Sequence, residues 1–248
     1  MSSLFRRAAV IVAALSGLFL ATPALGILVR PVVIDLTSAG SGASSSLEVV
    51  NDRNRPMAVE VKVQKLILGE RGQPVVQPDS GDDFVIFPTI ANIAPGARQV
   101  FRIRYIGNPS IAQSKLYMFS TAELPVPLDP NEKQAQLQIV YAINSIVTVK
   151  PPKAKPDVRV AEVDRKTSSK GVQGVDVVFQ NDGPAHAYIG TDTLQLSSGS
   201  WHVTLDAGAF GKAVGLGLVP PNAKRAMFIP LANVPPSGPI SGELKPAS

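Results

Sequence analysis

Short stretches in which apolar and polar residues alternate recur along the chain. Residues 59–64 and residues 100–103 alternate with a period of two, which is the pattern of a strand with one buried face. Residues 84–87 are apolar at every position, which predicts a strand buried on both faces. Beyond the N-terminal segment no window sustains a 3.6-residue period, so the pattern predicts strands and no further helix.

Turn-forming residues separate these strands and repeat in the two halves of the chain. The 22 prolines and 20 glycines fall between the β-rich runs. Residues 47–59 and residues 175–187 each read as a strand, an Asn-Asp turn and a second strand. Residues 95–101 correspond to residues 221–227, as a turn that leads into a strand. About seven short strands per half predict an all-β fold of two related immunoglobulin-like β-sandwich domains.

A proline-rich stretch marks the predicted boundary between the two halves. Residues 149–156 read Val-Lys-Pro-Pro-Lys-Ala-Lys-Pro, and proline fixes φ and lacks the N–H that a β-ladder needs. We therefore predict a short, stiff hinge that joins an N-terminal domain at residues 27–150 to a C-terminal domain at residues 151–248.

The first 26 residues have the features of a secretory signal peptide. Arg6 and Arg7 precede an apolar run at residues 8–21, and the small residues Ala24 and Gly26 form a cleavage site. The run of about 14 apolar residues is shorter than the roughly 20 that a membrane-spanning helix needs. We predict export and cleavage after Gly26, with Ala24 as the alternative. No other segment is long and apolar enough to cross a membrane.

Charge and rare residue types exclude several classes of function. The 24 basic and 19 acidic residues give a net charge of +5, but the basic residues are scattered and only 6% of residues are aromatic, which argues against a nucleic-acid partner. With no cysteine and two histidines, His186 and His202, the chain is not expected to form disulfides, use thiol catalysis or bind a metal. Residues 208–212 lack the spacing of a phosphate loop. We expect no catalytic residue, cofactor or metal.

Several segments in a fixed order resemble the PapD-like periplasmic chaperones of the chaperone/usher pathway, which assemble pili and related surface fibres. In the second half only Asn181-Asp182 and Pro220-Pro221 match. The matching segments of the first half are residues 29–34, 50–52, 84–88, 93–96, 100–103, 116–119, 123–125 and 137–151. The resemblance implies a non-enzymatic, ATP-independent chaperone of two immunoglobulin-like domains set at an angle. It also implies a periplasmic location, pilus subunits as clients and delivery to an outer-membrane usher.

In this family the chaperone lends an edge strand to a pilus subunit that lacks its own last strand. The matching strand here is residues 137–143, with Leu137, Ile139, Tyr141 and Ile143 on one face. Strand addition of this kind obtains affinity from backbone ladder bonds and register from alternating apolar side chains. The pattern alone is that of an ordinary strand that buries this face in its own core, and the resemblance favours the lending strand.

The resemblance also assigns charged residues to the cleft and to the junction between the domains. Arg30 matches the first-strand basic residue that binds the subunit's C-terminal carboxylate, and the alternative is a solvated arginine at a strand end. The second basic residue of this anchor is missing, because Ile146 stands where the family usually has lysine. Glu123 and Lys150 match an ion pair across the domain junction, and the alternative is two exposed charges.

Two other classes of function remain open on the sequence. A secreted two-domain β-sandwich adhesin or carbohydrate-binding module would need exposed aromatic side chains, but the chain has one tryptophan, Trp201, and four tyrosines. A hydrolase would need an acid-base constellation, and neither histidine lies near a serine or cysteine in a recognisable nucleophile motif. The sequence therefore favours the chaperone.

Overall fold

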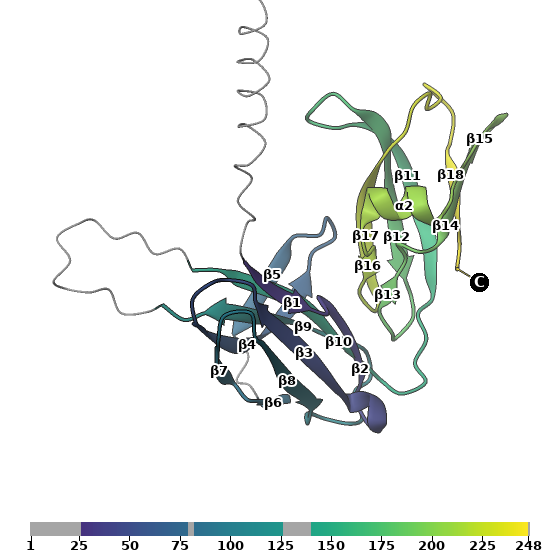
Figure 1. Ribbon diagram of the computed structural model, residues 1–248. Helices are drawn as coiled ribbons and strands as arrows, with labels where there is room; N and C mark the ends of the chain where they lie inside the picture. The colour runs from purple at the N-terminus through teal and green to yellow at the C-terminus, as the bar shows by residue number, and fades with distance from the viewer. Residues whose placement is uncertain (1–25, 79–81, 126–139, 248) are drawn as a thin grey trace, which may run out of the picture.

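The computed structural model describes residues 26–78, 82–125 and 140–247. The predicted signal peptide, apart from Gly26, and the predicted lending-strand residues Leu137 and Ile139 lie outside this part of the chain. Within it, the chain forms two β-sandwich domains with separate hydrophobic cores (Figure 1). No helix in these ranges combines the length and the apolar character that a membrane span requires. The predicted fold class, all-β with two sandwich domains, is confirmed.

The N-terminal domain has two sheets that pack face to face, and a short 3-10 helix, η2 (Ser41–Ala43). The first sheet contains, in spatial order, β1 (Ile27–Arg30), β3 (Ser44–Asn51), β8 (Arg98–Tyr105) and β6 (Phe84–Phe87). The second sheet contains, in spatial order, β2 (Val33–Thr37), β10 (Ala142–Lys150), β9 (Lys115–Glu123), β4 (Met57–Leu68) and β5 (Pro74–Pro78), and β7 (Ile90–Ile93) also pairs with β4.

Alternating side chains from both sheets fill the core of this domain. Every second residue of β8 from Phe101 to Tyr105 is buried, as the period of two predicts. The ring of Phe84 makes edge-to-face contacts with Tyr105, Tyr117 and Phe119, at centroid distances of 5.4, 4.8 and 5.0 Å. This aromatic cluster joins β6 and β8 of the first sheet to β9 of the second.

The apolar run at residues 84–87 is buried on one face only, so the prediction of burial on both faces is wrong. Phe84 and Ile86 are buried, whereas Val85 is 49% exposed and Phe87 is 72% exposed. The run forms β6, one of the two edge strands of the first sheet, which pairs with β8. Only one face of this sheet packs on the core, and apolar residues on its outer face remain at the surface.

The first strand of the domain crosses from one sheet to the other, and this crossing leaves one edge open. β1 pairs antiparallel with β3 in the first sheet. After Pro31 and Val32 the chain continues as β2, which pairs parallel with β10 only from Ile146 to Lys150. The beginning of β10, from Ala142 to Ser145, therefore has β9 on one side and no strand of the described chain on the other.

The C-terminal domain contains three small sheets. The first has, in spatial order, β11 (Val158–Thr167), β12 (Gln173–Asn181) and β17 (Ala223–Pro230). β13 (Ala187–Tyr188) pairs with β16 (Leu218–Val219), and the third sheet has, in order, β15 (Trp201–Leu205), β14 (Thr193–Ser198) and β18 (Ser241–Lys245). The stiff hinge and the domain limits at residues 150 and 151 stay predictions.

This domain also contains one helix, α2 (Ala207–Val214), which the sequence pattern did not predict. The Asp206 carboxylate caps it by accepting a hydrogen bond from the Ala209 N–H at 2.8 Å. Gly215 follows its last residue, with a φ of 63° that favours glycine. Phe210 is its one fully buried residue. Two turns with one buried side chain are too short to show a 3.6-residue period, although the capping Asp206 was a usable signal.

The repeated Asn-Asp turns have equivalent structures in the two domains. Asn51 ends β3 and Asn181 ends β12, and both are fully buried. Each side-chain amide donates to the carbonyl four residues ahead, at 2.8 and 2.7 Å, and each side-chain oxygen accepts from the N–H two residues ahead. Each amide also donates to a carbonyl later in its domain, that of Ile93 or Pro220. The sequence repeat thus corresponds to a repeated structural device.

Candidate functional site

Tyr141 and the first residues of β10 have no strand of the described chain on the side away from β9, and we call residues 141–145 the open edge. The Tyr141 carbonyl accepts a hydrogen bond from the Glu123 N–H at 2.9 Å, so the odd-numbered residues of this stretch point their backbone groups toward β9. The Ile146 N–H donates the other way, to the crossover between β1 and β2. Ala142 and Asn144 therefore direct N–H and C=O groups to the side where the described chain has no strand. Such an edge can accept another strand.

Two of the four predicted lending residues lie on the open edge. Tyr141 and Ile143 share the face of β10 that continues into the core as Ser145 and Val147. Tyr141 is 48% exposed, whereas Ile143 is partly buried and packs against the core of its own domain. Tyr141 is thus accessible to a second chain. The lending role of both residues stays a prediction.

Arg30 lies near one end of the open edge but is engaged by another residue. It is the last residue of β1, and the carbonyl of the next residue, Pro31, lies 3.4 Å from Ser145 Oγ. Arg30 Nε donates to Glu48 Oε1 at 2.7 Å, and the Arg30 side chain is 58% exposed. This hydrogen bond holds the pKa of the Glu48 carboxyl below its ordinary value. Carboxylate anchoring by Arg30 stays a prediction.

The structure does not bring Glu123 and Lys150 together, which corrects the predicted ion pair. The two residues lie at opposite ends of the antiparallel β9–β10 pair. Glu123 is buried and pairs with Arg53 at 2.9 Å and with Arg55 at 3.0 Å. Lys150 pairs instead with Asp35 at 3.0 Å. The antiparallel register separates the two charges that the resemblance had assigned to one junction.

His186 is one of the side chains that cross the domain junction, a role that the sequence did not indicate. It is 2% exposed, and its Nε2 lies 3.3 Å from Asp35 Oδ1. Its Nδ1 lies 3.0 Å from Ser114 Oγ, and its backbone N–H donates to the same oxygen at 3.1 Å. The Ser114 N–H donates in turn to the Pro184 carbonyl at 2.9 Å. These bonds join the second sheet of the N-terminal domain to the C-terminal domain.

Asp35 accepts hydrogen bonds from several groups at this junction. Thr148 Oγ1 donates to Asp35 Oδ1 at 2.9 Å and lies 3.2 Å from the Tyr188 hydroxyl. Desolvation raises the pKa of Asp35, but hydrogen bonds from His186, Lys150 and Thr148 together outweigh it and lower the pKa from 3.8 to about 2. Burial raises the pKa of Tyr188 to about 12. Asp35 therefore remains ionised, and Tyr188 protonated, at neutral pH.

We expect Asp35→Asn to lower the free energy of unfolding at neutral pH. The difference from wild type should become smaller as the solution becomes acidic. The pKa of about 2 in the folded protein lies below the ordinary 3.8, so the ionised carboxylate stabilises the fold above about pH 4 and this contribution is lost as the pH falls through 2. Because the Asp35 side chain is 37% exposed, solvent screening reduces the effect to about 1 kcal/mol. Urea unfolding at pH 7 and pH 2.5 measures the free energy of unfolding of the variant and of wild type. An equal difference between the two proteins at both pH values would contradict a stabilising role of the ionised Asp35 carboxylate.

Apolar side chains from both domains close the junction next to these polar groups. Leu66 and Leu116 of the N-terminal domain pack with Leu218 of the C-terminal domain, and Ile146 and Tyr188 pack against this cluster. Ile146 is the position at which the resemblance expects lysine. An ammonium group there would lose hydration against leucine side chains, which is unfavourable without a paired charge. The missing second anchor is thus part of an apolar contact between the domains.

The β4–β5 hairpin forms a second attachment between the domains. Arg71 at its tip pairs with Asp176 at 2.8 Å. The Ala226 N–H donates to the Glu70 carbonyl at 2.8 Å, and Arg225 Nη1 donates to the Gly69 carbonyl at 2.9 Å. With two separate attachments, the N-terminal domain holds the C-terminal domain at more than one place.

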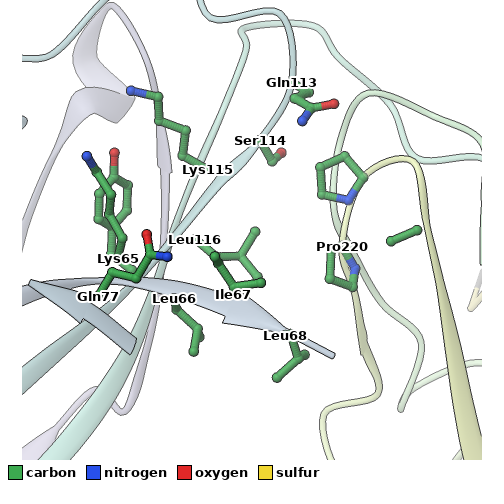
Figure 2. A pocket seen from close by; sticks show the side chains of 13 residues that line it. Lys65, Leu66, Ile67, Leu68, Gln77, Gln113, Ser114, Lys115, Leu116 and Pro220 are labelled. Carbon is green, nitrogen blue, oxygen red and sulfur yellow. The ribbon is translucent and has the colours of Figure 1, made fainter. Parts of the chain in front are cut away.

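A groove of about 470 Å³ lies at this junction and is lined by both domains (Figure 2). Figure 2 shows Lys65 and Lys115 toward one end, Pro220 across from them and apolar side chains between. Lys115 is paired with Asp83 at 3.1 Å, and Gln113 accepts a hydrogen bond from Asn222 at 2.8 Å. The apolar residues of the lining are Leu66, Ile67, Leu68, Leu116, Pro220, Pro221 and Ala223. The groove is thus a predominantly apolar space within the junction.

Over the described ranges, no three His, Cys, Asp or Glu side chains are placed to hold a metal ion. His202 lies exposed on β15, whereas His186 is buried in the junction.

Comparison with known families gives one match, over the first half of the chain. The model of the PapD N-terminal domain of pili and flagellar-assembly chaperones matches residues 27–155, which is just over half of the sequence. No curated protein sequence matches significantly.

Solved structures with a similar fold include chaperones, two of them from fimbrial systems. The class 5 fimbriae chaperone CfaA has 12% identity and a TM-score of 0.53, covering 90% of this chain and 100% of its own. A chaperone–tip adhesin complex of CFA/I fimbriae biogenesis has 13% identity and a TM-score of 0.52, covering 89% and 98%. The YadV chaperone has 14% identity and a TM-score of 0.51, covering 88% and 90%. At these identities the comparison establishes the two-domain fold.

Proposed function

Since this chain belongs to the family of PapD-like pilus-assembly chaperones, we propose that it captures a pilus subunit by adding its open edge to the subunit's sheet. The family is one of chaperones that are not enzymes. In this proposal the mature protein acts in the periplasm after removal of residues 1–26. It then delivers the captured subunit to an outer-membrane usher.

The observation that carries the proposal is the pair of outward-directed residues Ala142 and Asn144. Backbone groups at a sheet edge form ladder bonds with any strand that aligns beside them, whatever its side chains. β2 covers β10 only from Ile146 onward, so an incoming strand has room along the open edge and must end near Val33. The crossover between β1 and β2 therefore limits where a subunit strand can bind.

Side chains on the open edge support the same role. Tyr141, half exposed on the core-directed face of β10, is placed to enter an apolar groove beside the added strand. Ile143 continues that face into the core of the N-terminal domain. A subunit strand added here would extend the second sheet, and its apolar groove would continue the chaperone's own core. Leu137 and Ile139 extend the same alternation in sequence.

Arg30 is proposed to bind the subunit's C-terminal carboxylate where the added strand ends. Pro31 lies beside Ser145, so Arg30 is close to that end of the open edge. We expect Arg30→Ala to weaken subunit binding about three- to tenfold, less than a free arginine would contribute, because Glu48 competes for the guanidinium.

Arg98→Ala is the matched control for Arg30. Arg98 also approaches Glu48, at 3.7 Å, but it lies on β8 and not beside the open edge. Isothermal titration of both variants with a purified subunit makes the comparison. Equal affinities of the subunit for Arg30→Ala and Arg98→Ala would show that Arg30 does not bind the C-terminal carboxylate of the subunit.

Co-purification tests the function as a whole. The tagged chain, expressed in the periplasm with the genes that neighbour its own, is expected to recover a pilus subunit in a stable complex. Binding of this complex to the periplasmic N-terminal part of an usher tests delivery. Recovery of the chain alone, or with a polysaccharide, would favour the adhesin or carbohydrate-binding alternative.

A further inference from the structure

Glu123 is the centre of a buried ion cluster next to the open edge. The side chain of Glu123 is 4% exposed, that of Arg53 is 9% exposed and that of Arg55 is 45% exposed. Arg53 Nη1 donates to both carboxylate oxygens, at 3.0 and 2.9 Å, and Arg55 Nη2 donates to Oε1 at 3.0 Å. One buried carboxylate therefore holds two guanidinium groups through charge-assisted hydrogen bonds.

The turn between β3 and β4 presents both arginines to this carboxylate. Asn51 Oδ1 accepts the Arg53 N–H at 3.1 Å, and Asn51 Nδ2 donates to the Arg55 carbonyl at 2.8 Å. Asn51 is fully buried, so the backbone of both arginines is held by the core of the domain. The Arg53 guanidinium is fixed from two sides, by its own backbone and by Glu123.

The Arg53 guanidinium lies over the ring of Tyr141, on the open edge. The distance from Arg53 Cζ to the ring centroid is 4.9 Å, within the range of a cation–π contact. The Glu123 N–H donates to the Tyr141 carbonyl at 2.9 Å. Glu123 thus holds Tyr141 twice, directly at the backbone and through Arg53 at the ring.

We propose that Arg53, held by Glu123, is a positioning residue that fixes Tyr141 and so orders the open edge before a subunit binds. This inference rests on the proposed function and names the group that prepares the lending strand. An edge that must become ordered during binding loses affinity, whereas an ordered edge avoids that loss. Arg55 shares the carboxylate, but in the described chain the contact with the Tyr141 ring belongs to Arg53 alone.

Amide exchange in the free protein tests this positioning without any client. The Ile143 N–H points toward β9 next to Tyr141, so its exchange rate reports opening of this end of β10. We expect Arg53→Ala to raise exchange at Ile143 roughly three- to thirtyfold, the range that a lost cation–π contact gives, and to leave Val147 unchanged. Arg53→Lys keeps a cation over the ring and should stay close to wild type.

Two comparisons decide whether the ring contact is responsible. Arg55→Ala removes a cation from Glu123 without touching Tyr141, and it should leave Ile143 exchange unchanged. In the Tyr141→Leu background, Arg53→Ala should have little further effect, because the ring that Arg53 holds is gone. The inference is overturned if Arg55→Ala accelerates Ile143 as much as Arg53→Ala does, or if the Arg53 and Tyr141 substitutions act additively.

Binding of the subunit recovered by co-purification separates this inference from the proposed function. Arg53→Ala should weaken binding by about the factor seen in exchange, and Ala142→Pro in the same assay reports the open edge itself. Loss of binding in Ala142→Pro with none in Arg53→Ala contradicts only the positioning role. Unchanged binding in Ala142→Pro contradicts the proposed function.

Discussion

Replacing both Ala142 and Asn144 by proline is expected to weaken subunit binding at least thirtyfold while the chaperone stays folded. Each proline removes an N–H that points to the open edge, so the incoming strand loses a ladder bond and one of its carbonyls is left without a donor. An unsatisfied buried carbonyl costs roughly 1–3 kcal/mol, and two of them give roughly 2–6 kcal/mol. Proline is tolerated on an edge strand whose N–H faces outward, so the β9–β10 ladder should survive.

Two control proteins make this result specific. Ala142→Ser with Asn144→Ala changes the same two side chains but keeps both N–H groups, and it should bind the subunit nearly as well as wild type. Ile143→Pro removes an N–H that points toward β9 and should lower the melting temperature of the free protein. Affinity by titration and Tm by circular dichroism are measured for each. Wild-type affinity in the double proline variant would show that the subunit binds elsewhere.

Asn181→Ala is expected to cause a large loss of stability, about 3–5 kcal/mol in the C-terminal domain. The buried Asn181 amide donates to the carbonyls of Ala185 and Pro220, at 2.7 and 3.1 Å. Its oxygen accepts N–H bonds from Asp157 and from Gly183, both at 3.0 Å. Alanine leaves these groups buried without partners, and each orphaned group costs roughly 1–3 kcal/mol.

The single tryptophan makes this measurement specific to one domain. Trp201 lies on β15 and packs against the core of the C-terminal domain, so its fluorescence follows unfolding of that domain. Asn181→Ala should lower the fluorescence-detected Tm by about 10 °C or more. Asp182→Ala, which changes the neighbouring exposed residue, should shift it little. A small shift for Asn181→Ala would mean that water or a local rearrangement satisfies these groups.

The strands and the sandwich could be predicted because their signal is local. Alternation in β8 and the Asn-Asp turns that end β3 and β12 are set by residues close in sequence, and the structure confirms both. A short apolar run cannot tell a strand covered on both faces from a strand covered on one, because that depends on which layers pack against its sheet. The apolar run of β6 was for this reason assigned two buried faces, although Phe87 lies at the surface.

The ion pairs could not be predicted because they depend on register across the sheets. Glu123 and Lys150 match family positions, but the antiparallel pairing of β9 and β10 places them at opposite ends. Their actual partners, Arg53 and Arg55 for one and Asp35 for the other, are more than 65 residues away in sequence, as separations of 70, 68 and 115 show. Residue type alone does not identify such partners.

The junction histidine illustrates the same limit. His186 lies between Ala185 and Ala187, a small and apolar setting that is typical of burial, but nothing nearby indicates its bonds to Ser114 and Asp35. These bonds form only when the two domains meet. Likewise, the replacement of lysine by Ile146 was visible in the sequence, whereas its packing against Tyr188 and Leu218 was not.

The most direct test of strand addition is amide exchange at Ala142 and Asn144 in the complex with a subunit. In the free protein both N–H groups point to the open edge and should exchange rapidly, whereas the Ile143 N–H, directed at β9, serves as the internal control. We expect subunit binding to slow exchange at Ala142 and Asn144 by at least a hundredfold, as roughly 3 kcal/mol of ladder protection gives, and to change Ile143 much less. Rapid exchange at both residues in a stable complex would show that the subunit does not pair with this edge.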